Sequence, residues 1–337
     1  MAAAPDEPAA PASEGMATES VAVRARSARP PPRRLLLLAA LGVLLALLLY
    51  YPVGAWRAHV IDDDIGFASA APPAGQSHAV TVAAALIRRE IDQHGWTPNK
   101  PFFMPAAILD DMPAYQKGIL AAVGRFAIEM DEQVGRRAQG DSGGPEGDPD
   151  LGRAAGLLQY PPNVWMIDPA VPWATTVSTE KQYRNAARAL EAYNQRLAAG
   201  QAAFFRRPEA LAALLDRFAW DTDATAAGLD QAAGNGGGWF AGHIAGPFYG
   251  AKGRAYGTLL VLNALGDDFS NLLVERHLAA DWHAMLAALQ AAATPRPWVV
   301  LSGTADSTLV PNHPAVLGYH LSRAGSRMAA LAKALRQ

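Results

Sequence analysis

The feature that most constrains this chain is an uncharged apolar run near its N-terminus, from Leu35 to Val53. A helix of this length covers about 28 Å at a rise of about 1.5 Å per residue, which matches the hydrocarbon core of a bilayer. Tyr50, Tyr51 and Trp56 lie at its far end, where amphipathic rings favour the membrane interface. The pattern predicts a transmembrane helix over residues 35–56.

The residues before this helix predict its orientation. Residues 1–34 are rich in Ala, Pro, Ser and Glu and lack apolar periodicity, which predicts a disordered cytoplasmic tail. Arginines close this tail, and by the positive-inside rule they hold the N-terminus in the cytoplasm. These arginines are Arg24, Arg26, Arg29, Arg33 and Arg34. We therefore expect a signal anchor in a bacterial inner membrane, with the C-terminal domain in the periplasm.

A cleaved signal peptide is the competing interpretation, because Ala68-Ser69-Ala70 has the small-x-small form that signal peptidase accepts. This site lies well beyond the apolar run and behind the acidic residues Asp62 to Asp64. A cleavable apolar segment is shorter and ends close to its cut. Anchoring is therefore the favoured interpretation.

Beyond the membrane segment, the sequence predicts a linker over residues 57–77 and a helical domain over residues 78–337. Apolar residues recur with a helical period at Val80, Ala84 and Ile87, which is typical of an amphipathic helix. Further helical patterns cover 114–138, 179–197, 208–219, 222–233, 247–265, 268–292 and 314–335. Only 298–302 resembles a strand, and one strand makes no sheet. We expect an all-α helical bundle with long ordered coil segments.

Composition and charge exclude several functions. The formal net charge is −2 and no basic cluster lies outside the N-terminus, so nucleic acid is not an expected partner. The chain has no cysteine, which excludes structural disulfides, thiolate nucleophiles and cysteine-ligated zinc. We predict no cofactor.

One predicted loop contains a sequence that matches a protease motif. Gly140-Asp-Ser-Gly-Gly-Pro145 matches the segment around the nucleophile of chymotrypsin-like proteases and would make Ser142 catalytic. Its surroundings have helical patterns rather than the strands that such folds need. A solvated turn is the favoured interpretation.

A second motif suggests a metal site, because Glu275, His277, Asp281 and His283 lie close together in the sequence. On one continuous helix, His283 lies about 240° round from His277, so three ligands cannot converge. We predict no metal.

Three stretches together resemble an uncharacterised bacterial family, domain of unknown function 2333. They are Trp96-Thr-Pro-Asn99 with Leu109-Asp-Asp-Met-Pro-x-Tyr-Gln-x-Gly118, Phe248-Tyr-Gly-Ala-Lys-Gly-Arg-Ala-Tyr256, and Pro311-Asn-His-Pro314. The resemblance implies a single-pass membrane protein of Gram-negative bacteria. It names no reaction, because the family has no assigned activity.

A small-residue seam provides one candidate groove. Gly246, Gly250, Gly253 and Gly257 recur at helical spacing, so a neighbouring backbone can approach this face closely. Helix packing is the favoured use. The alternative is a ligand or partner helix in the groove, flanked by Lys252 and Arg254.

Aromatic and acidic residues complete the candidate groove. Tryptophans in coil could line a cleft, although pinning a loop to the core is the favoured role. Asp110 and Asp111 could serve in acid–base chemistry, although capping the following helix is favoured. The full candidate set is Trp96, Asn99, Asp110, Asp111, Gln116, Trp165, Tyr249, Lys252 and Arg254.

The function that these features favour is a membrane-anchored periplasmic binding or scaffold protein of the cell envelope. Its expected partners are the inner membrane, through residues 35–56, and other envelope proteins or peptidoglycan. The alternative is a periplasmic hydrolase acting on cell-wall material, with Asp110 or Asp111 as acid or base. A sensor is a third option, but the short tail has no recognisable output module.

Overall fold

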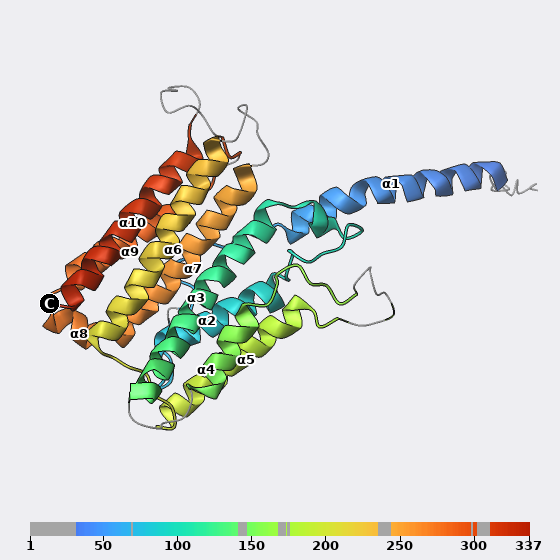
Figure 1. The fold of residues 1–337 in the computed structure, drawn as a ribbon. Helices are drawn as coiled ribbons and strands as arrows, with labels where there is room; N and C mark the ends of the chain where they lie inside the picture. Colours follow the sequence, from blue (N-terminus) through green and yellow to red (C-terminus); the bar gives the residue numbers. More distant parts are fainter. Residues whose placement is uncertain are drawn as a thin grey trace, which may run out of the picture. The chain divides into compact units, whose positions relative to one another are not determined.

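The computed structural model describes residues 32–337 apart from 69, 141–146, 168–172, 174–175, 235–243, 298 and 302–310, and apart from the side chains of 32 and 136–140. The described residues form helices and no strand (Figure 1). The predicted all-α class is therefore confirmed. Contacts divide the chain into two units, residues 1–47 and residues 48–337.

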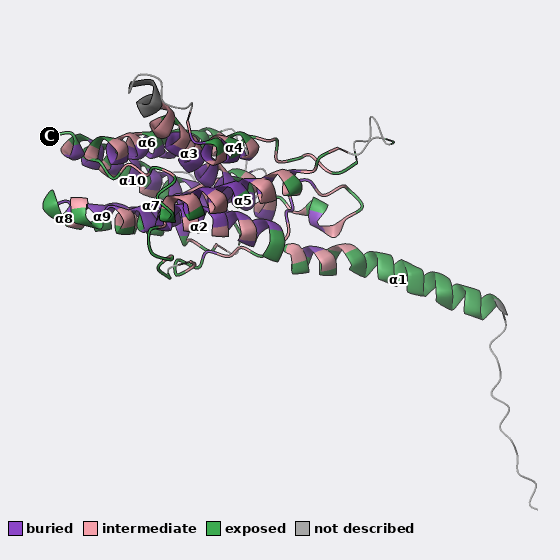
Figure 2. Cartoon of the chain, turned by 90° about the horizontal axis from the view of Figure 1, so that it is seen from below, coloured by how far each residue is buried: buried purple, intermediate pink, exposed green. Residues whose placement is uncertain are grey.

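Helix α1, Pro32–Ala58, contains the predicted membrane segment. Its side chains from Leu35 to Leu49 are all exposed, as the green ribbon in Figure 2 shows. A helix that is apolar all round and exposed suits lipid rather than water. Within the described ranges, α1 is the helix that is long and apolar enough to cross a membrane. Its direction across the membrane stays a prediction.

The remaining helices belong to the second unit. They are α2 His78–Arg88, followed by a π-helical turn Arg89–Gln93, a 3-10 turn Pro105–Ile108, α3 Asp111–Gly140, α4 Pro149–Leu158, α5 Thr179–Ala198, α6 Pro208–Gly234, α7 Ala245–Asp268, α8 Ser270–Glu275, α9 Ala279–Ala293 and α10 His313–Leu335. Most overlap predicted helical segments and extend beyond their bounds by a few residues.

Helix α7 is shared by two groups of packed helices. On one side, α2 and α3 both pack against α7, and α5 and α4 join them to complete a ring. On the other side, α9 packs against α7 and α10, and α10 packs against α6. Figure 1 shows α6, α7, α9 and α10 side by side. Buried residues therefore cover most faces of α7, as expected of a helix at the centre of a bundle.

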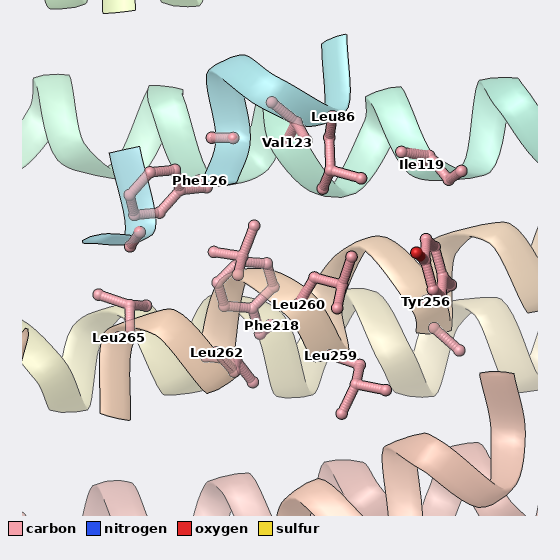
Figure 3. Packing of buried hydrophobic residues seen from close by; sticks show 14 of the residues in the cluster. Leu86, Ile119, Val123, Phe126, Phe218, Tyr256, Leu259, Leu260, Leu262 and Leu265 are labelled. Atoms are coloured by element: carbon pink, nitrogen blue, oxygen red, sulfur yellow. The ribbon is translucent and has the colours of Figure 1, made fainter. Parts of the chain in front are cut away.

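The core between α3, α6 and α7 consists of large apolar side chains. Val123 and Phe126 of α3 lie opposite Leu260 and Leu265 of α7, and Phe218 of α6 packs beside them (Figure 3). Each of these side chains is almost wholly buried. Burying a side chain of this size stabilises the fold by about 1.5–3 kcal/mol relative to leaving it exposed.

The prediction of two helices over 208–219 and 222–233 is wrong, because α6 is continuous. Polar residues from Asp221 to Asp223 interrupt the apolar pattern, yet each of the first two has a partner. Thr222 donates its hydroxyl to the carbonyl oxygen of Phe218 at 2.6 Å, and Arg125 binds the Asp221 carboxylate. The helix therefore passes through the polar stretch without a break.

The prediction of one helix over 268–292 is also wrong, because α8 and α9 are separate. His277 lies between them with φ of 55°, a left-handed conformation that is uncommon for a residue other than glycine. The sequence has no glycine there to signal the break.

Two further differences concern residues 148–158 and 298–302. Helix α4 was not predicted, although Asp148 caps it by accepting from the amides of Asp150 and Leu151, and Pro149 occupies its first turn. The strand suggested for 298–302 is wrong for its described residues, because 299–301 form no strand.

The segment predicted as a linker contacts the helical domain at both ends. Asp63 is only 4% exposed. At the other end, Ser77 caps α2 and donates its hydroxyl to the Asp268 carboxylate at 2.6 Å. That carboxylate also accepts the backbone amides of His78 and Ala79. Helix α1 is therefore followed by a segment that is fastened to the helical domain at both of its ends.

Candidate functional site

Glycines bring α3 and α7 into close contact. A Cβ atom at Gly118 would overlap the carbonyl oxygen of Gly250, and one at Gly253 would overlap the carbonyl oxygen of Tyr115. A Cβ at Gly257 would lie 3.0 Å from the Cβ of Ala122. Gly253 and Gly257 of the glycine seam are therefore used for helix packing, as the favoured interpretation predicted, whereas a Cβ at Gly246 would meet no atom within 4 Å.

Next to this contact, residues of α3, α6 and α7 line an open pocket of about 770 Å³, which we call the α3–α7 pocket. Its walls consist mainly of small residues: Ala114, Gly118, Ala224, Thr225, Gly246, Pro247, Gly250 and Ala251. Its charged side chains are Asp110, Lys117 and Arg254. Two of the predicted candidates, Asp110 and Arg254, therefore meet at one pocket.

The two cations of the α3–α7 pocket lack partners in the part of the chain that the structure describes. Among these residues, neither Lys117 nor Arg254 has a hydrogen-bond or ion-pair partner, and the Asp110 carboxylate has none either. Lys117 is exposed, whereas Arg254 is partly buried. Burial lowers the pKa of Arg254 below its ordinary value, although the charge of Asp221 opposes this. The pocket thus holds cationic groups that no described carboxylate neutralises directly.

The first turn of α7 adds to this positive potential. Gly246 and Pro247 line the pocket, and the N-cap residue Ile244 makes no side-chain capping bond. Unsatisfied amides and the helix dipole at such an end favour anions. Arginine and lysine together with a helix N-terminus form a set of groups that suits a carboxylate or a phosphate.

An adjacent ion pair provides a contrast. Arg125 donates its Nε to Asp221 at 2.7 Å and a terminal nitrogen to the other carboxylate oxygen at 3.1 Å. Both residues line a smaller pocket of about 170 Å³ that Arg254 also lines. Among the described residues, the bonds to the Asp221 side chain come from Arg125, and no hydrogen bond or ion pair joins Asp221 to Arg254.

Lys252, the other predicted flanking cation, lies in a separate place. Its side chain is fully buried, and its ammonium donates to the Asp63 carboxylate and to the carbonyl oxygen of Pro295, both at 2.8 Å. Arg296 also donates to Asp63. Burial alone would raise the pKa of Asp63, but the hydrogen bonds from Arg296 and Lys252 outweigh it and lower the pKa.

A second buried pair adjoins this one. Arg89 is 1% exposed and donates its Nε to Glu90 at 3.0 Å and a terminal nitrogen to the hydroxyl of Tyr256 at 2.8 Å. Tyr256 in turn donates to the carbonyl oxygen of Asp64 at 2.6 Å. We call Asp63, Arg89, Glu90 and Lys252 the buried charge cluster. It ties residues 62–64 to the π-helical turn that follows α2 and to α7.

Three other candidates, Trp96, Asn99 and Gln116, take part in a network of hydrogen bonds that holds coil segments in place. Gln116 is fully buried and accepts from the amide and hydroxyl of Thr97, while its side-chain nitrogen donates to Gly95. Trp96 donates its ring nitrogen to the carbonyl oxygen of Pro162 at 2.9 Å, and Asn99 donates to that of Val164 at 3.0 Å. These bonds fasten two coil segments to the helices. Trp96, which is 1% exposed, therefore pins a loop to the core.

The last three candidates have separate contacts. Trp165 lies edge-on to Phe103, with ring centroids 5.8 Å apart. Tyr249 packs edge-on against Phe248. Asp111 begins α3, and its carboxylate lies 3.8 Å from Nε2 of His59. The structure therefore distributes the nine candidates over several places, and the α3–α7 pocket receives two of them.

The motifs set aside in the sequence have different outcomes. Ser142 and most of the surrounding motif lie outside the described residues. Within the described ranges, no group of three His, Asp or Glu side chains is placed to hold a metal ion. His283 instead contacts the carbonyl oxygen of Ala279 through Nδ1 at 2.6 Å.

Several residues of these sites were missed in the sequence. Lys117 occupies the unspecified position of the Tyr115-Gln-x-Gly118 stretch, and its place at the α3–α7 pocket could have been found only with the partner helix known. Asp63 lies in the predicted linker, and Arg89 was not singled out in the sequence. Their partners on α7 are 189 and 167 residues away in the chain, so no local pattern links them.

Comparison with known proteins identifies the family. A family model described as an uncharacterized protein conserved in bacteria, domain of unknown function 2333, matches residues 57–235, which is more than half of the chain. No curated protein matches, and no solved structure matches. The match covers Asp110 and Lys117 and ends before α7, so the quoted stretches at 248–256 and 311–314 lie beyond it. The chain belongs to the uncharacterised bacterial family of domain of unknown function 2333.

Proposed function

We propose that this protein is a membrane-anchored binding protein of the bacterial cell envelope. In this proposal α1 spans the inner membrane, the helical domain lies in the periplasm, and the α3–α7 pocket binds a carboxylate or phosphate group of an envelope component. The observation that carries the proposal is that Lys117 and Arg254 meet at one pocket without a partner among the described residues. Lys252, Arg89 and Arg125 all have carboxylate partners, whereas these two cations are available for a ligand.

The energetics of the pocket support binding over a structural role. An arginine that is partly withdrawn from water and has no described partner gives up hydration without gaining a hydrogen bond, which costs free energy in the unliganded fold. A ligand with an anionic group would restore that loss through charge-assisted hydrogen bonds. The small residues of the walls leave the room that such a group needs.

Anchoring can be tested because the chain has no cysteine of its own. A single cysteine at Val274, which is 65% exposed on α8, should react in intact cells with a maleimide that cannot cross the inner membrane. A cysteine at Ser20, in the predicted cytoplasmic tail, should react only after lysis. The reverse pattern would contradict the periplasmic placement.

Binding can be tested by crosslinking from the pocket wall. A photoreactive residue at Ala224, which is exposed on the pocket lining, should give adducts in cells that disappear in an Arg254→Gln background. Arg323→Gln, which removes the same charge from an exposed site on α10, should leave the adducts unchanged. Adducts that survive Arg254→Gln would contradict recognition by this cation.

A hydrolase is the alternative function, and one observation favours it. Asp110 lies at the same pocket as the two cations, so a carboxylate faces the place where an anionic substrate would bind. An acid or base at that position could act on a bound cell-wall fragment. The test is to incubate purified peptidoglycan with the full-length protein and with an Asp110→Asn variant. Release of soluble fragments by the first and not by the second would favour the hydrolase function over the binding function.

A further inference from the structure

The segment that leads into α3 exposes large apolar side chains. Phe102 is 83% exposed, Ile108 is 58% exposed and Phe103 is 46% exposed. Three such side chains within seven consecutive residues form a local apolar surface, which marks an interaction site more often than isolated exposed residues do.

Hydrogen bonds fix this surface against the end of α1. Tyr50 donates its hydroxyl to the carbonyl oxygen of Phe103 at 3.2 Å, and Tyr51 donates to that of Phe102 at 3.0 Å. The ring of Pro105 packs so closely on Gly54 that a Cβ at Gly54 would overlap it. Figure 1 shows the domain end of α1 beside the chain that enters α3.

The position of Tyr50 and Tyr51 along α1 indicates that the exposed apolar side chains contact lipid. Tyr50 and Tyr51 lie in the last turn of the apolar run, where tyrosine and tryptophan favour the boundary between headgroups and acyl chains. Side chains fastened at that level lie at the same depth in the bilayer. Because water alone would cover Phe102 in a soluble protein, the exposed ring suits lipid better than solvent.

Trp56 and Arg57, which follow Tyr50 and Tyr51 in α1, also suit the membrane interface. Trp56 is 79% exposed, and an indole at the membrane surface places its apolar ring in lipid and its N–H in the headgroup layer. Arg57 is exposed, and within the described ranges it has no ion-pair partner, so its guanidinium can bind headgroup phosphate. Aromatic rings beside such a cation are typical of a surface that rests in an anionic membrane interface.

We infer that residues 101–108 are a second membrane contact, in which Phe102, Phe103 and Ile108 insert into the interface of the bilayer that α1 spans. The domain is then held directly on the membrane surface. This inference rests on the anchoring part of the proposed function and not on the pocket. It also places the pocket near the lipid headgroups, because Asp110 at the pocket is followed by Asp111, which contacts His59 just beyond α1.

Depth-dependent fluorescence quenching tests this inference on the full-length chain. The protein is reconstituted in vesicles of phosphatidylcholine and phosphatidylglycerol with one cysteine, labelled by an environment-sensitive fluorophore, at Phe102. Lipids with a nitroxide at a shallow acyl position quench a label at the interface, and lipids with a nitroxide at a deep acyl position quench a label near the bilayer centre. Leu44→Cys, in the middle of the apolar run of α1, is the reference for the bilayer centre, and Val274→Cys on α8 is the reference for water, since all three side chains are exposed.

The expected result is loss of most of the Phe102 fluorescence with shallow quencher, while the Val274 label keeps its emission. A Phe102 label that behaves like the Val274 label, while the Leu44 label is quenched, would overturn the inference and leave the anchor intact. A Leu44 label that the deep nitroxide does not quench would overturn the anchor and the inference together. Ile108→Cys repeats the test if Phe102→Cys gives poorly folded protein.

Discussion

Lys252 and Arg254 lie two residues apart on α7 and have opposite surroundings. Lys252 is fully buried and donates to the Asp63 carboxylate and to a backbone carbonyl. Arg254 faces the α3–α7 pocket and has no hydrogen-bond partner among the described residues. Within the described part of the chain, one helix therefore presents a cation that is fully satisfied and a cation that is not.

The difference separates a role in folding from a role in binding. Removing a charge from water costs several kcal/mol, and only good partners offset it. The buried charge cluster therefore fixes the segment after α1 on the π-helical turn that follows α2 and on α7. Arg254 has no such partner among the described residues, so its charge should add little to the stability of the fold. Variants of the two regions should therefore have opposite effects on stability and on binding.

The largest expected effect is from Asp63→Ala. It leaves the Lys252 ammonium buried with one carbonyl partner, and breaking a buried ion pair in this way costs about 3–5 kcal/mol. Chemical denaturation of the detergent-solubilised full chain measures the change. Asp64→Ala is the matched control, because that carboxylate is exposed and accepts the amide of Gly66, so it should cost about 0.5–1.5 kcal/mol. Equal losses in the two variants would contradict a special role for Asp63.

A smaller loss is expected from Gly253→Ala. The added Cβ would overlap the carbonyl oxygen of Tyr115, so α3 and α7 must separate, and such overpacking costs about 1–3 kcal/mol. Gly228→Ala on α6 is the control, since its Cβ meets nothing within 4 Å and alanine should stabilise the helix by up to about 1 kcal/mol. If Gly253→Ala behaves like Gly228→Ala in thermal unfolding, the close glycine contact is not required.

Acidification should lower the free energy of unfolding, because it protonates Asp63 in the buried charge cluster. The folded-state pKa of Asp63 is lowered, because hydrogen bonds from Arg296 and Lys252 outweigh the effect of burial. A lowered folded pKa adds stability that is present above the unfolded value of 3.8 and is lost as the pH falls through the folded pKa. The free energy of unfolding should therefore fall as the pH drops through and below the unfolded value of 3.8, and it should fall more steeply in the natural protein than in Asp63→Asn. Parallel pH profiles would show that Asp63 does not carry this dependence.

The sequence predicted the elements whose causes are local. The apolar run of α1 and the regular stripe of α10, with Leu317, Leu321 and Met328 all buried, follow from residue spacing alone. The break at His277 was missed because no glycine marks it. The sequence divided α6 at its polar residues, because no local pattern reveals that Asp221 pairs with Arg125 of α3.

The candidate site was harder to predict, because its pairings are not local. Asp63 was placed in a linker, since three consecutive acidic residues are usually solvated, but its partners Lys252 and Arg296 lie 189 and 233 residues away. Lys252 and Arg254 were equivalent in the sequence as flanks of one glycine seam. Only the packing of α3 on α7 distinguishes the buried cation from the one at the pocket.

The most direct test of the account compares Lys252→Gln with Arg254→Gln in the same two assays, denaturant unfolding and crosslinking from Ala224. The account predicts that Arg254→Gln changes stability by no more than about 0.5 kcal/mol and abolishes the adducts, whereas Lys252→Gln destabilises the protein strongly. An Arg254→Gln variant that keeps its adducts and loses as much stability as Lys252→Gln would contradict the division of α7 between folding and binding.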